Sequence, residues 1–362
     1  MRSFVYYVSG HGFGHARRSA EIIGALLHRD PALTVHVRTS APRAIFDTIH
    51  NARLQYHSSA IDPGVVERDP LSLNIPKTLD RFRTLLERAP ELIETEAAFV
   101  SKQHASLILA DVPFLAGEIA SHVGVPCLAV SNFTWDWIFK PLVNTEAHRE
   151  LLTTIRNGYA KMAGLIRLPF GHDNPRFPRI VDVPLVANRS TRAPAEVLGD
   201  LDLSQDRRPR ILIGMRGGVS VESLRTAAFQ SPRLLFVIPY QLKGALPPNV
   251  LTADCDAGCP SAFADLTSVS DVVVSKLGYG IVADCIAART RLLWPRRNDF
   301  REDELTEAGS RRFVAHREIP TNDFYEGKWN EHLEVLLAQP MPTEQPPLDG
   351  PEVAAKVIQE WR

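Results

Sequence analysis

The first half of the chain alternates short runs of apolar residues with longer segments of helical period. A β-branched and aromatic run at residues 4–8 precedes a segment in which Ala20, Ile23 and Leu27 recur at helical spacing. We therefore predict a strand followed by a helix of about 15 residues from His15. Further strands are predicted at 33–37, 106–110 and 126–130, with helices near 42–50 and 115–123. This βαβα order predicts a parallel sheet with helices on both faces.

A proline-rich polar passage from Pro169 to Pro194 interrupts this pattern and is interpreted as a linker. Four strand-like runs follow it, at 210–214, 234–238, 271–274 and 291–294. We predict an α/β chain of two Rossmann-like, doubly wound domains, 1–185 and 186–349, with a terminal helix in 350–362 that can pack back on the first. The segment 62–85, which contains Pro63, Gly64 and Pro70, is interpreted as a mobile loop over the ligand site.

Length and composition are consistent with this division. The chain has 362 residues, which suits two domains of roughly 150 to 200 residues each. Lys and Arg number 41 against 42 Asp and Glu, so a net charge of −1 argues against a nucleic-acid groove or a polybasic membrane patch. Four cysteines are too few for a disulfide framework in a chain this long, which favours a reducing, cytoplasmic location. No run of about 18 uncharged apolar residues is present, so we predict no membrane span.

The stretch SGHGFGH, residues 9–15, follows the first predicted strand. Its glycines depart from the dinucleotide fingerprint G-x-G-x-x-G, because Ala16 or Arg17 stands at the third glycine place, and no acidic residue ends the second strand. His15 lies at the mouth of the predicted helix, where the helix dipole favours the neutral imidazole, and it is a candidate general base. The alternative is that His11 or His15 only caps the helix or bonds a backbone carbonyl.

Asp111 follows the predicted strand at 106–110 directly, in the position that the glycine loop has on the first strand. A carboxylate there can orient an imidazole and stabilise its protonated form. The alternative is that Asp111 caps the helix that follows.

The second half contains SKLGYGIVADC, residues 275–285, in which Gly278 and Gly280 open a predicted helix near Ile281. Amides at such a helix start form a site for phosphate oxygens, and Lys276 adds a positive charge. Asp284, one turn further on, is placed to reach ribose hydroxyls. A second glycine turn ends the first strand of this half, and it offers further groups for the same diphosphate: Arg216, Gly217 and Gly218.

The run at 296–304 brings Glu302 and Asp303 to the end of a fourth strand, as acceptors for sugar hydroxyls. The alternative is a charged helix start that faces solvent. Asp-x-Asp pairs at Asp200 and Asp202 and at Asp254 and Asp256 match a metal-binding pattern of sugar transferases formally. We predict no metal, because amide-lined turns and cations already meet the diphosphate.

Several of these stretches resemble the GT-B glycosyltransferases, and within them the glycosyltransferase-like N-terminal half of L-arabinokinases. They are residues 6–18, 62–73, 132–139, 182–189, 275–285 and 296–304. The resemblance implies two Rossmann-like domains that face each other across a cleft. No G-x-x-x-x-G-K-S/T loop or glycine-rich kinase motif is present, so arabinokinase activity is not implied.

The resemblance also implies roles for single residues. It makes His15, preceded by Gly14, and Asp111 the catalytic dyad, with Asp284 on the ribose and Glu302 and Asp303 on the donor sugar. This chain departs from most such transferases, which carry Glu at the ribose position and Gln in the later pair. The predicted donor site is Gly14, Arg216, Gly217, Gly218, Phe263, Lys276, Gly278, Tyr279, Gly280, Ile281, Asp284, Glu302 and Asp303.

The predicted acceptor side comprises His11, Phe13, Phe133 and Trp135. The aromatic residues of the stretch NFTWDWIF, residues 132–139, can stack on an acceptor, with a place in the core as the alternative.

The implied activity is transfer of a sugar, with inversion, from a nucleoside diphosphate sugar, UDP by default, to a hydroxyl of a small-molecule or glycan acceptor. No cofactor, metal or nucleic-acid partner is expected. Two alternatives are a nucleotide-sugar-binding module without turnover, and a nucleotide-sugar epimerase or hydrolase on the same fold.

Overall fold

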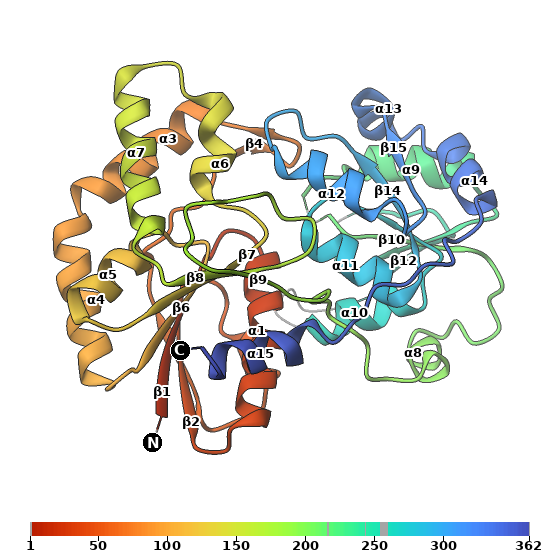
Figure 1. Ribbon diagram of the computed structural model, residues 1–362. Helices are drawn as coiled ribbons and strands as arrows, with labels where there is room; N and C mark the ends of the chain where they lie inside the picture. Colours follow the sequence, from red (N-terminus) through yellow and green to blue (C-terminus); the bar gives the residue numbers. More distant parts are fainter. Residues whose placement is uncertain (1, 216, 243, 254–259, 362) are drawn as a thin grey trace. The chain divides into compact units, whose positions relative to one another are not determined.

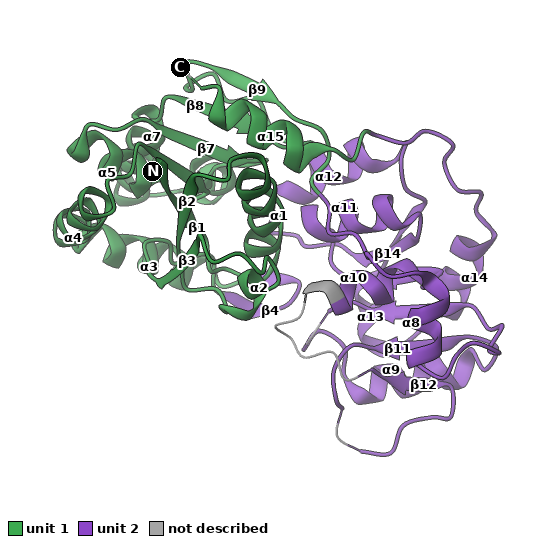
Figure 2. Cartoon of the chain, turned by 90° about the horizontal axis from the view of Figure 1, so that it is seen from below, with its two compact units in different colours: residues 1–66, 73–186, 347–362 green, residues 67–72, 187–346 purple. Residues whose placement is uncertain are grey.

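The structure is a computed structural model that describes residues 2–215, 217–242, 244–253 and 260–361 (Figure 1). The chain divides into two compact units (Figure 2). Unit 1 comprises Met1–Val66, Leu73–Val186 and Pro347–Arg362, and unit 2 comprises Glu67–Ser72 and Ala187–Pro346. Each unit is an α/β structure with its own parallel sheet.

The sheet of unit 1 has seven strands in the order β3-β2-β1-β6-β7-β8-β9, and its neighbouring strands run parallel. Phe4 to Tyr7 are no more than 1% exposed, as expected of a central strand covered on both faces. The strands are β1 (Arg2–Val8), β2 (Leu33–Thr39), β3 (Leu54–Ser58), β6 (Leu107–Asp111), β7 (Cys127–Ser131), β8 (Gly164–Arg167) and β9 (Ile180–Asp182).

Helices cover both faces of this sheet (Figure 1). The C-terminal helix α15 (Gly350–Gln359) packs on α1 (Gly14–Arg29) within unit 1, and the Gln359 amide donates to the Leu26 carbonyl at 3.4 Å. The other helices of unit 1 are α2 (Ala44–Asp47), α3 (Ile75–Glu87), α4 (Ala89–Lys102), α5 (Leu115–Val123), α6 (Trp135–Phe139), the 3₁₀ turn η1 (Lys140–Leu142) and α7 (Glu146–Ala160).

The sheet of unit 2 has six parallel strands in the order β12-β11-β10-β13-β14-β15. Its strands are β10 (Arg210–Ile213), β11 (Leu235–Ile238), β12 (Val250–Thr252), β13 (Val272–Val274), β14 (Arg291–Pro295) and β15 (His316–Ile319). Its helices are α8 (Pro194–Asp200), α9 (Val221–Gln230), α10 (Pro260–Ser268), α11 (Tyr279–Ala288), α12 (Glu302–Ser310), α13 (Thr321–Glu326) and α14 (Asn330–Ala338).

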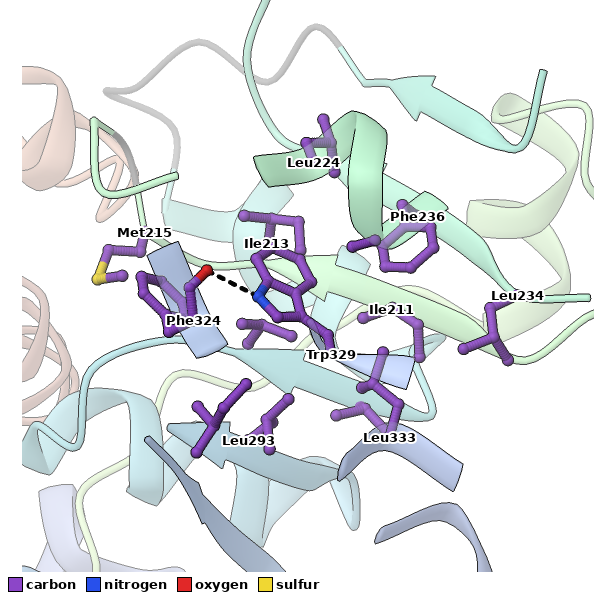
Figure 3. Close-up of a cluster of buried hydrophobic side chains, with 14 of the residues drawn as sticks. Ile211, Ile213, Met215, Leu224, Leu234, Phe236, Leu293, Phe324, Trp329 and Leu333 are labelled. Atoms are coloured by element: carbon purple, nitrogen blue, oxygen red, sulfur yellow. Dashed lines mark hydrogen bonds between the residues drawn. The ribbon is translucent and has the colours of Figure 1, made fainter. Parts of the chain in front are cut away.

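Trp329 lies in the hydrophobic core of unit 2 and is 0% exposed (Figure 3). Its indole N–H donates to the Phe324 carbonyl at 2.9 Å, so the polar edge of the ring is satisfied inside the core. Figure 3 shows side chains from β10, β11, β14, α9 and α14 around it.

Three segments differ from the prediction. Strand β9 lies inside the passage interpreted as a linker, where it forms the edge of the unit 1 sheet. Helix α3 begins within the predicted loop 62–85, because Asn74 caps it by accepting from the Lys77 amide at 3.2 Å and Pro76 stands in its first turn. The predicted helix near 42–50 is reduced to the four residues of α2.

Residues 67–72 belong to unit 2, although the chain on either side of them belongs to unit 1. They include β4 (Glu67–Asp69), which pairs with β5 (Ser72–Leu73). Leu71 is 5% exposed and lies in the hydrophobic core of unit 2, and the Tyr325 hydroxyl donates to Asp69 at 3.0 Å. This segment is therefore held by unit 2 rather than free as a loop. Among the helices of the described chain, none is long and apolar enough to span a membrane.

Candidate active site

Each sheet has a topological switch point, where the chain stops adding strands on one side and begins on the other. In unit 1 it lies between β1 and β6, and in unit 2 between β10 and β13. Ligands of open α/β sheets bind outside the carboxyl ends of the strands at such points. The loops that follow these strands, together with the helices α1 and α11 that they lead into, contain most of the predicted site residues that the structure describes.

His15 and Asp111 meet at the switch point of unit 1. β1 and β6 are neighbours with Val8 opposite Asp111, so the residue that ends β6 lies beside the loop that leads from β1 into α1. His15 Nδ1 lies 2.9 Å from Asp111 Oδ1. Asp111 is 0% exposed and His15 is 9% exposed, so this contact is made away from bulk water.

Asp111 is ionised at neutral pH, which decides the tautomer of His15. Burial acts to raise the pKa of Asp111, but Arg18 and His15 outweigh it and hold the pKa at about 2. An ionised carboxylate only accepts hydrogen bonds, so Nδ1 of His15 carries the hydrogen in this contact. In the neutral ring, the lone pair is then on Nε2, the nitrogen that can take up a proton.

Arg18 is a third member of this cluster that was not predicted from the sequence. Its Nε donates to Asp111 Oδ2 at 2.7 Å and its Nη2 to Asp111 Oδ1 at 2.5 Å, which makes a two-pronged ion pair in a buried position. Arg18 Nη2 also lies 3.0 Å from His15 Nδ1. The imidazole therefore lies next to one carboxylate and one guanidinium.

The surrounding contacts fix these three side chains. The Ser19 hydroxyl donates to Asp111 Oδ2 at 3.0 Å, and Arg18 Nη1 donates to Asn132 Oδ1 at 2.7 Å. His15, Arg18 and Ser19 are spaced three and four residues apart, so they share one face of α1. This spacing was the signal in the sequence that could have led to Arg18.

The four residues predicted for the acceptor separate into two groups. His11 and Phe13 are half-buried on the loop before α1. Phe133 is 4% exposed, and its ring meets the imidazole of His15 edge to face, with centroids 5.6 Å apart. Phe133 thus packs against the candidate base.

The prediction that Trp135 stacks on an acceptor is wrong. Its side chain is 0% exposed and stacks on Phe139 with ring centroids 5.4 Å apart, while Phe82 meets its edge at 5.6 Å. Trp135 therefore lies in the core, which was the alternative. The indole N–H donates to Asp62 Oδ1 at 3.1 Å.

In unit 2, the two predicted phosphate-binding turns lie at the ends of neighbouring strands. The Ser275 hydroxyl donates to the Gly214 carbonyl at 3.0 Å, which ties the loop after β13 to the loop after β10. Gly217 has φ +71°, a conformation that favours glycine. Gly278 caps α11, and its neighbours Gly280 and Ile281 in the first turn are half-buried. Gly218 also lies in the first of these turns, while Arg216 lies outside the described residues.

Lys276 is bound to a carboxylate of its own unit. Its Nζ lies 2.7 Å from Glu67 Oε1, and each side chain is 32% exposed. The predicted phosphate-binding cation therefore carries an anionic partner from the segment 67–72.

Asp284 is 3% exposed and accepts from the backbone N–H of Asn188 at 2.8 Å. This contact ties α11 to the start of the long segment that leads to β10. At least one oxygen of the predicted ribose ligand thus has a structural partner.

Glu302 and Asp303 are 6% and 1% exposed, so the alternative of a solvent-facing helix start is wrong for them. Arg297 forms an ion pair with both, and its Nε lies 3.0 Å from Asp303 Oδ1. Arg297 Nη2 also donates to the Leu277 carbonyl at 3.2 Å, which joins this pair to the loop after β13. Burial raises the pKa of Asp303 although Arg297 opposes that.

The remaining predicted donor residues are placed as follows. Phe263 in α10 is 8% exposed and packs close to Gly214, and Tyr279, the first residue of α11, is 3% exposed. Gly14 is the exposed first residue of α1, in unit 1. Over the described ranges, no group of three or more His, Cys, Asp or Glu is arranged to hold a metal ion. Asp200 instead pairs with Arg192 at 2.5 Å, and Asp254 and Asp256 lie outside the described residues.

The chain was compared with known proteins by sequence and by structure. No protein-family profile matches the chain. It is similar to a protein of Arabidopsis thaliana named L-arabinokinase, with 29% identity over 361 residues, or 99% of this chain and 34% of that protein. The chain thus spans about a third of the length of the curated relative that it matches.

The structure is similar to solved glycosyltransferases over 99% of the chain. The calicheamicin glycosyltransferase CalG4 matches with a TM-score of 0.64 and 15% identity over 93% of its own chain. The glycosyltransferase VinC in complex with dTDP matches with a TM-score of 0.61 and 14% identity over 94% of its chain. A UDP-glucosyltransferase from Polygonum tinctorium, capable of glucosylating indoxyl, matches with a TM-score of 0.63 and 15% identity over 92% of its chain. The chain therefore has the GT-B fold, made of two Rossmann-like α/β units, that these glycosyltransferases have.

Proposed function

We propose that the chain is a glycosyltransferase that transfers a sugar from a nucleoside diphosphate sugar to a hydroxyl of an acceptor. The observation that carries this proposal is the buried contact between His15 and Asp111 at the switch point of unit 1. It provides an imidazole with a fixed tautomer in a fold to which the compared glycosyltransferases also belong.

In the proposed reaction, His15 Nε2 takes the proton of the acceptor hydroxyl as the hydroxyl oxygen attacks the anomeric carbon. The bond from that carbon to the diphosphate oxygen breaks, and its electron pair leaves with the nucleoside diphosphate. A single displacement of this kind inverts the configuration at the anomeric carbon. Asp111 keeps Nδ1–H pointed at itself and stabilises the imidazolium that forms.

Unit 2 is proposed to bind the donor. The backbone amides at the start of α11 and the turn at Gly217 and Gly218 offer hydrogen bonds to diphosphate oxygens. Lys276 offers a positive charge to the diphosphate when its ion pair with Glu67 is broken. We propose UDP as the nucleotide, in keeping with the UDP-glucosyltransferase among the similar structures. No metal is proposed for this step.

A second candidate is a nucleotide-sugar-binding module without turnover. The observation that favours it is that several groups predicted to bind donor already have partners within unit 2: Asp284, Asp303 and Lys276. Such a module would bind the same nucleotide but would not depend on His15.

Thermal unfolding and calorimetry with UDP, dTDP, GDP and ADP, and then with the corresponding nucleoside diphosphate glucoses, test the proposal. A ligand at about 100 times its Kd stabilises the folded state by roughly 2.7 kcal/mol, which shifts the melting temperature measurably. We expect such a shift and a measurable heat with UDP. If none of these nucleotides or nucleotide sugars binds, the proposal is wrong.

A further inference from the structure

The backbone of Val112, the residue that follows Asp111, has an unusual conformation. Its φ is +82°, in the left-handed region that side chains other than glycine rarely adopt. Val112 is also β-branched and precedes Pro113, and both features favour an extended backbone instead. Among the described residues other than glycine that have a positive φ, Val112 is the only one with either feature. Strained backbone of this kind persists only where the surrounding contacts hold it, and it is concentrated at functional sites.

Tyr159 supplies one of these contacts. Its hydroxyl donates to the Val112 carbonyl at 2.6 Å and accepts from the backbone N–H of Trp135 at 3.2 Å. Tyr159 and Val112 are each 1% exposed, so bulk water does not compete for this hydrogen bond. Burial raises the pKa of Tyr159 well above its usual value, so the hydroxyl keeps the proton that it donates. The carbonyl of the strained residue therefore has a fixed partner.

Two glycines bring Tyr159 within reach of this turn. Gly117 of α5 and Gly158 of α7 lie where the two helices approach closely, because a Cβ added to Gly117 would stand 2.0 Å from the Gly158 carbonyl oxygen. A Cβ added to Gly158 would stand 2.7 Å from the Phe114 carbonyl oxygen. The start of α5 is thus held against the end of α7, next to Tyr159.

Asp111 is held on the other side of the strained residue. Its carbonyl accepts from the Ser9 amide at 3.1 Å, and its carboxylate lies 2.9 Å from His15 Nδ1. Rotation of Val112 to a negative φ would change the direction in which the chain leaves Asp111 for α5. Because α7 holds α5 in place, Asp111 would have to move instead. Its carboxylate would then leave its position beside His15.

We infer that Tyr159 is a positioning residue for the proposed reaction: it holds the strained turn at Val112 that directs the Asp111 carboxylate towards the imidazole. This inference rests on the proposed function. Tyr159 acts through the backbone and takes no part in the proton transfer. Glycine adopts a positive φ without steric cost, so Val112→Gly should make the hydroxyl of Tyr159 dispensable.

The hydrogen on His15 Nδ1 provides the test, because its hydrogen bond to a buried carboxylate shifts its proton NMR signal downfield and slows its exchange with water. The signal is assigned by its absence from His15→Gln. The variants are Tyr159→Phe and a double variant that combines Tyr159→Phe with Val112→Gly. The control is Tyr56→Phe, which removes another hydroxyl of unit 1 that donates to a backbone carbonyl, that of Ala41 at 2.7 Å.

We expect the signal in the unaltered chain and in Tyr56→Phe, its loss in Tyr159→Phe, and its return in the double variant. For the transfer of sugar from a UDP-sugar to an acceptor, kcat should fall about 10- to 100-fold in Tyr159→Phe, with the Kd for UDP unchanged. Retention of the signal or of kcat in Tyr159→Phe, or a double variant in which the signal does not return, would overturn the inference.

A crystal structure of the unaltered chain is a measurement that does not depend on the stability of a variant. It should show Val112 with a positive φ and its carbonyl bonded to Tyr159, and an extended Val112 would overturn the inference. Absence of UDP release from the unaltered chain with every acceptor would count against the proposed transferase. The NMR signal and its loss in Tyr159→Phe measure the positioning of Asp111 alone, so the two failures are distinguishable.

Discussion

Replacement of Asp111 by Asn tests whether one carboxylate holds the unit 1 site together. The variant removes the charge on which Arg18, His15 and Ser19 converge, and it leaves the guanidinium of Arg18 buried at 4% exposure without its counter-ion. Breaking a buried ion pair by removing one partner typically costs about 3–5 kcal/mol. Asn132 still accepts from Arg18, so we expect a loss of about 3 kcal/mol at pH 7, the lower end of that range.

Part of this loss depends on pH in a defined direction. The fall in the pKa of Asp111 from 3.8 to about 2 on folding corresponds to roughly 2 kcal/mol of stability. Because the folded-state pKa is the lower one, this stability is present above pH 4 and is lost as the pH falls towards 2. The stability difference between the unaltered chain and Asp111→Asn should therefore shrink by about 2 kcal/mol between pH 7 and pH 2.

Native-state hydrogen exchange of β1 and β6 is the suitable assay, because a chain of two units need not unfold in one step. The control is Asp80→Asn, which removes an exposed carboxylate paired with Arg83 and should change stability by less than about 0.5 kcal/mol. A difference between Asp111→Asn and the unaltered chain that stays constant over this pH range, or that stays below about 1 kcal/mol at pH 7, would refute the account of the cluster.

Three further predictions concern other contacts. Glu67→Gln should tighten UDP binding in calorimetry and Lys276→Met should weaken it, because the Glu67 carboxylate and the diphosphate compete for the Lys276 ammonium group. Unchanged UDP binding in both variants would mean that Lys276 does not contact the donor. Burial, aided by His57, lowers the pKa of His36 to about 4, so the melting temperature should fall as the pH drops from 6.5 towards 4. His36→Gln should make the melting temperature depend less on pH over this range. The same dependence on pH in both proteins would contradict this prediction. Trp135→Ala should lower stability by about 3–5 kcal/mol in urea unfolding, as expected for a core residue, and a fully stable variant would return this residue to the acceptor site.

The sequence allowed most strands and helices to be predicted because the central strands are continuous apolar runs, and β1, β10 and β13 each lead to a glycine-containing loop. The predicted helix 115–123 coincides with α5, and the fold class is confirmed. The contact between His15 and Asp111 was predicted by the same logic, since parallel strands bring their carboxyl ends to one edge of the sheet and both residues lie at such ends.

The partners of several other side chains were not predicted. Arg18 meets Asp111 across 93 positions of the chain. Its spacing of three from His15 places both on one face of α1, but this spacing alone does not identify Asp111 as its partner. The assignment of residues 67–72 to unit 2 depends on where Leu71 packs, which a six-residue segment does not encode by itself. Asp303 was predicted to bind the sugar without a protein partner. Its partner Arg297 lies six positions earlier in a loop, where no regular spacing indicates which side chains meet.

The most direct test of the account is the release of UDP from UDP-glucose and other UDP-sugars, measured with and without a panel of hydroxylated acceptors, in the unaltered chain and in His15→Ala. The account predicts release that requires an acceptor and that falls by about 10²- to 10⁴-fold in His15→Ala, with the Kd for UDP unchanged in calorimetry. Acceptor-dependent release that persists at the same rate in His15→Ala, or its absence from the unaltered chain with every acceptor, would contradict the account.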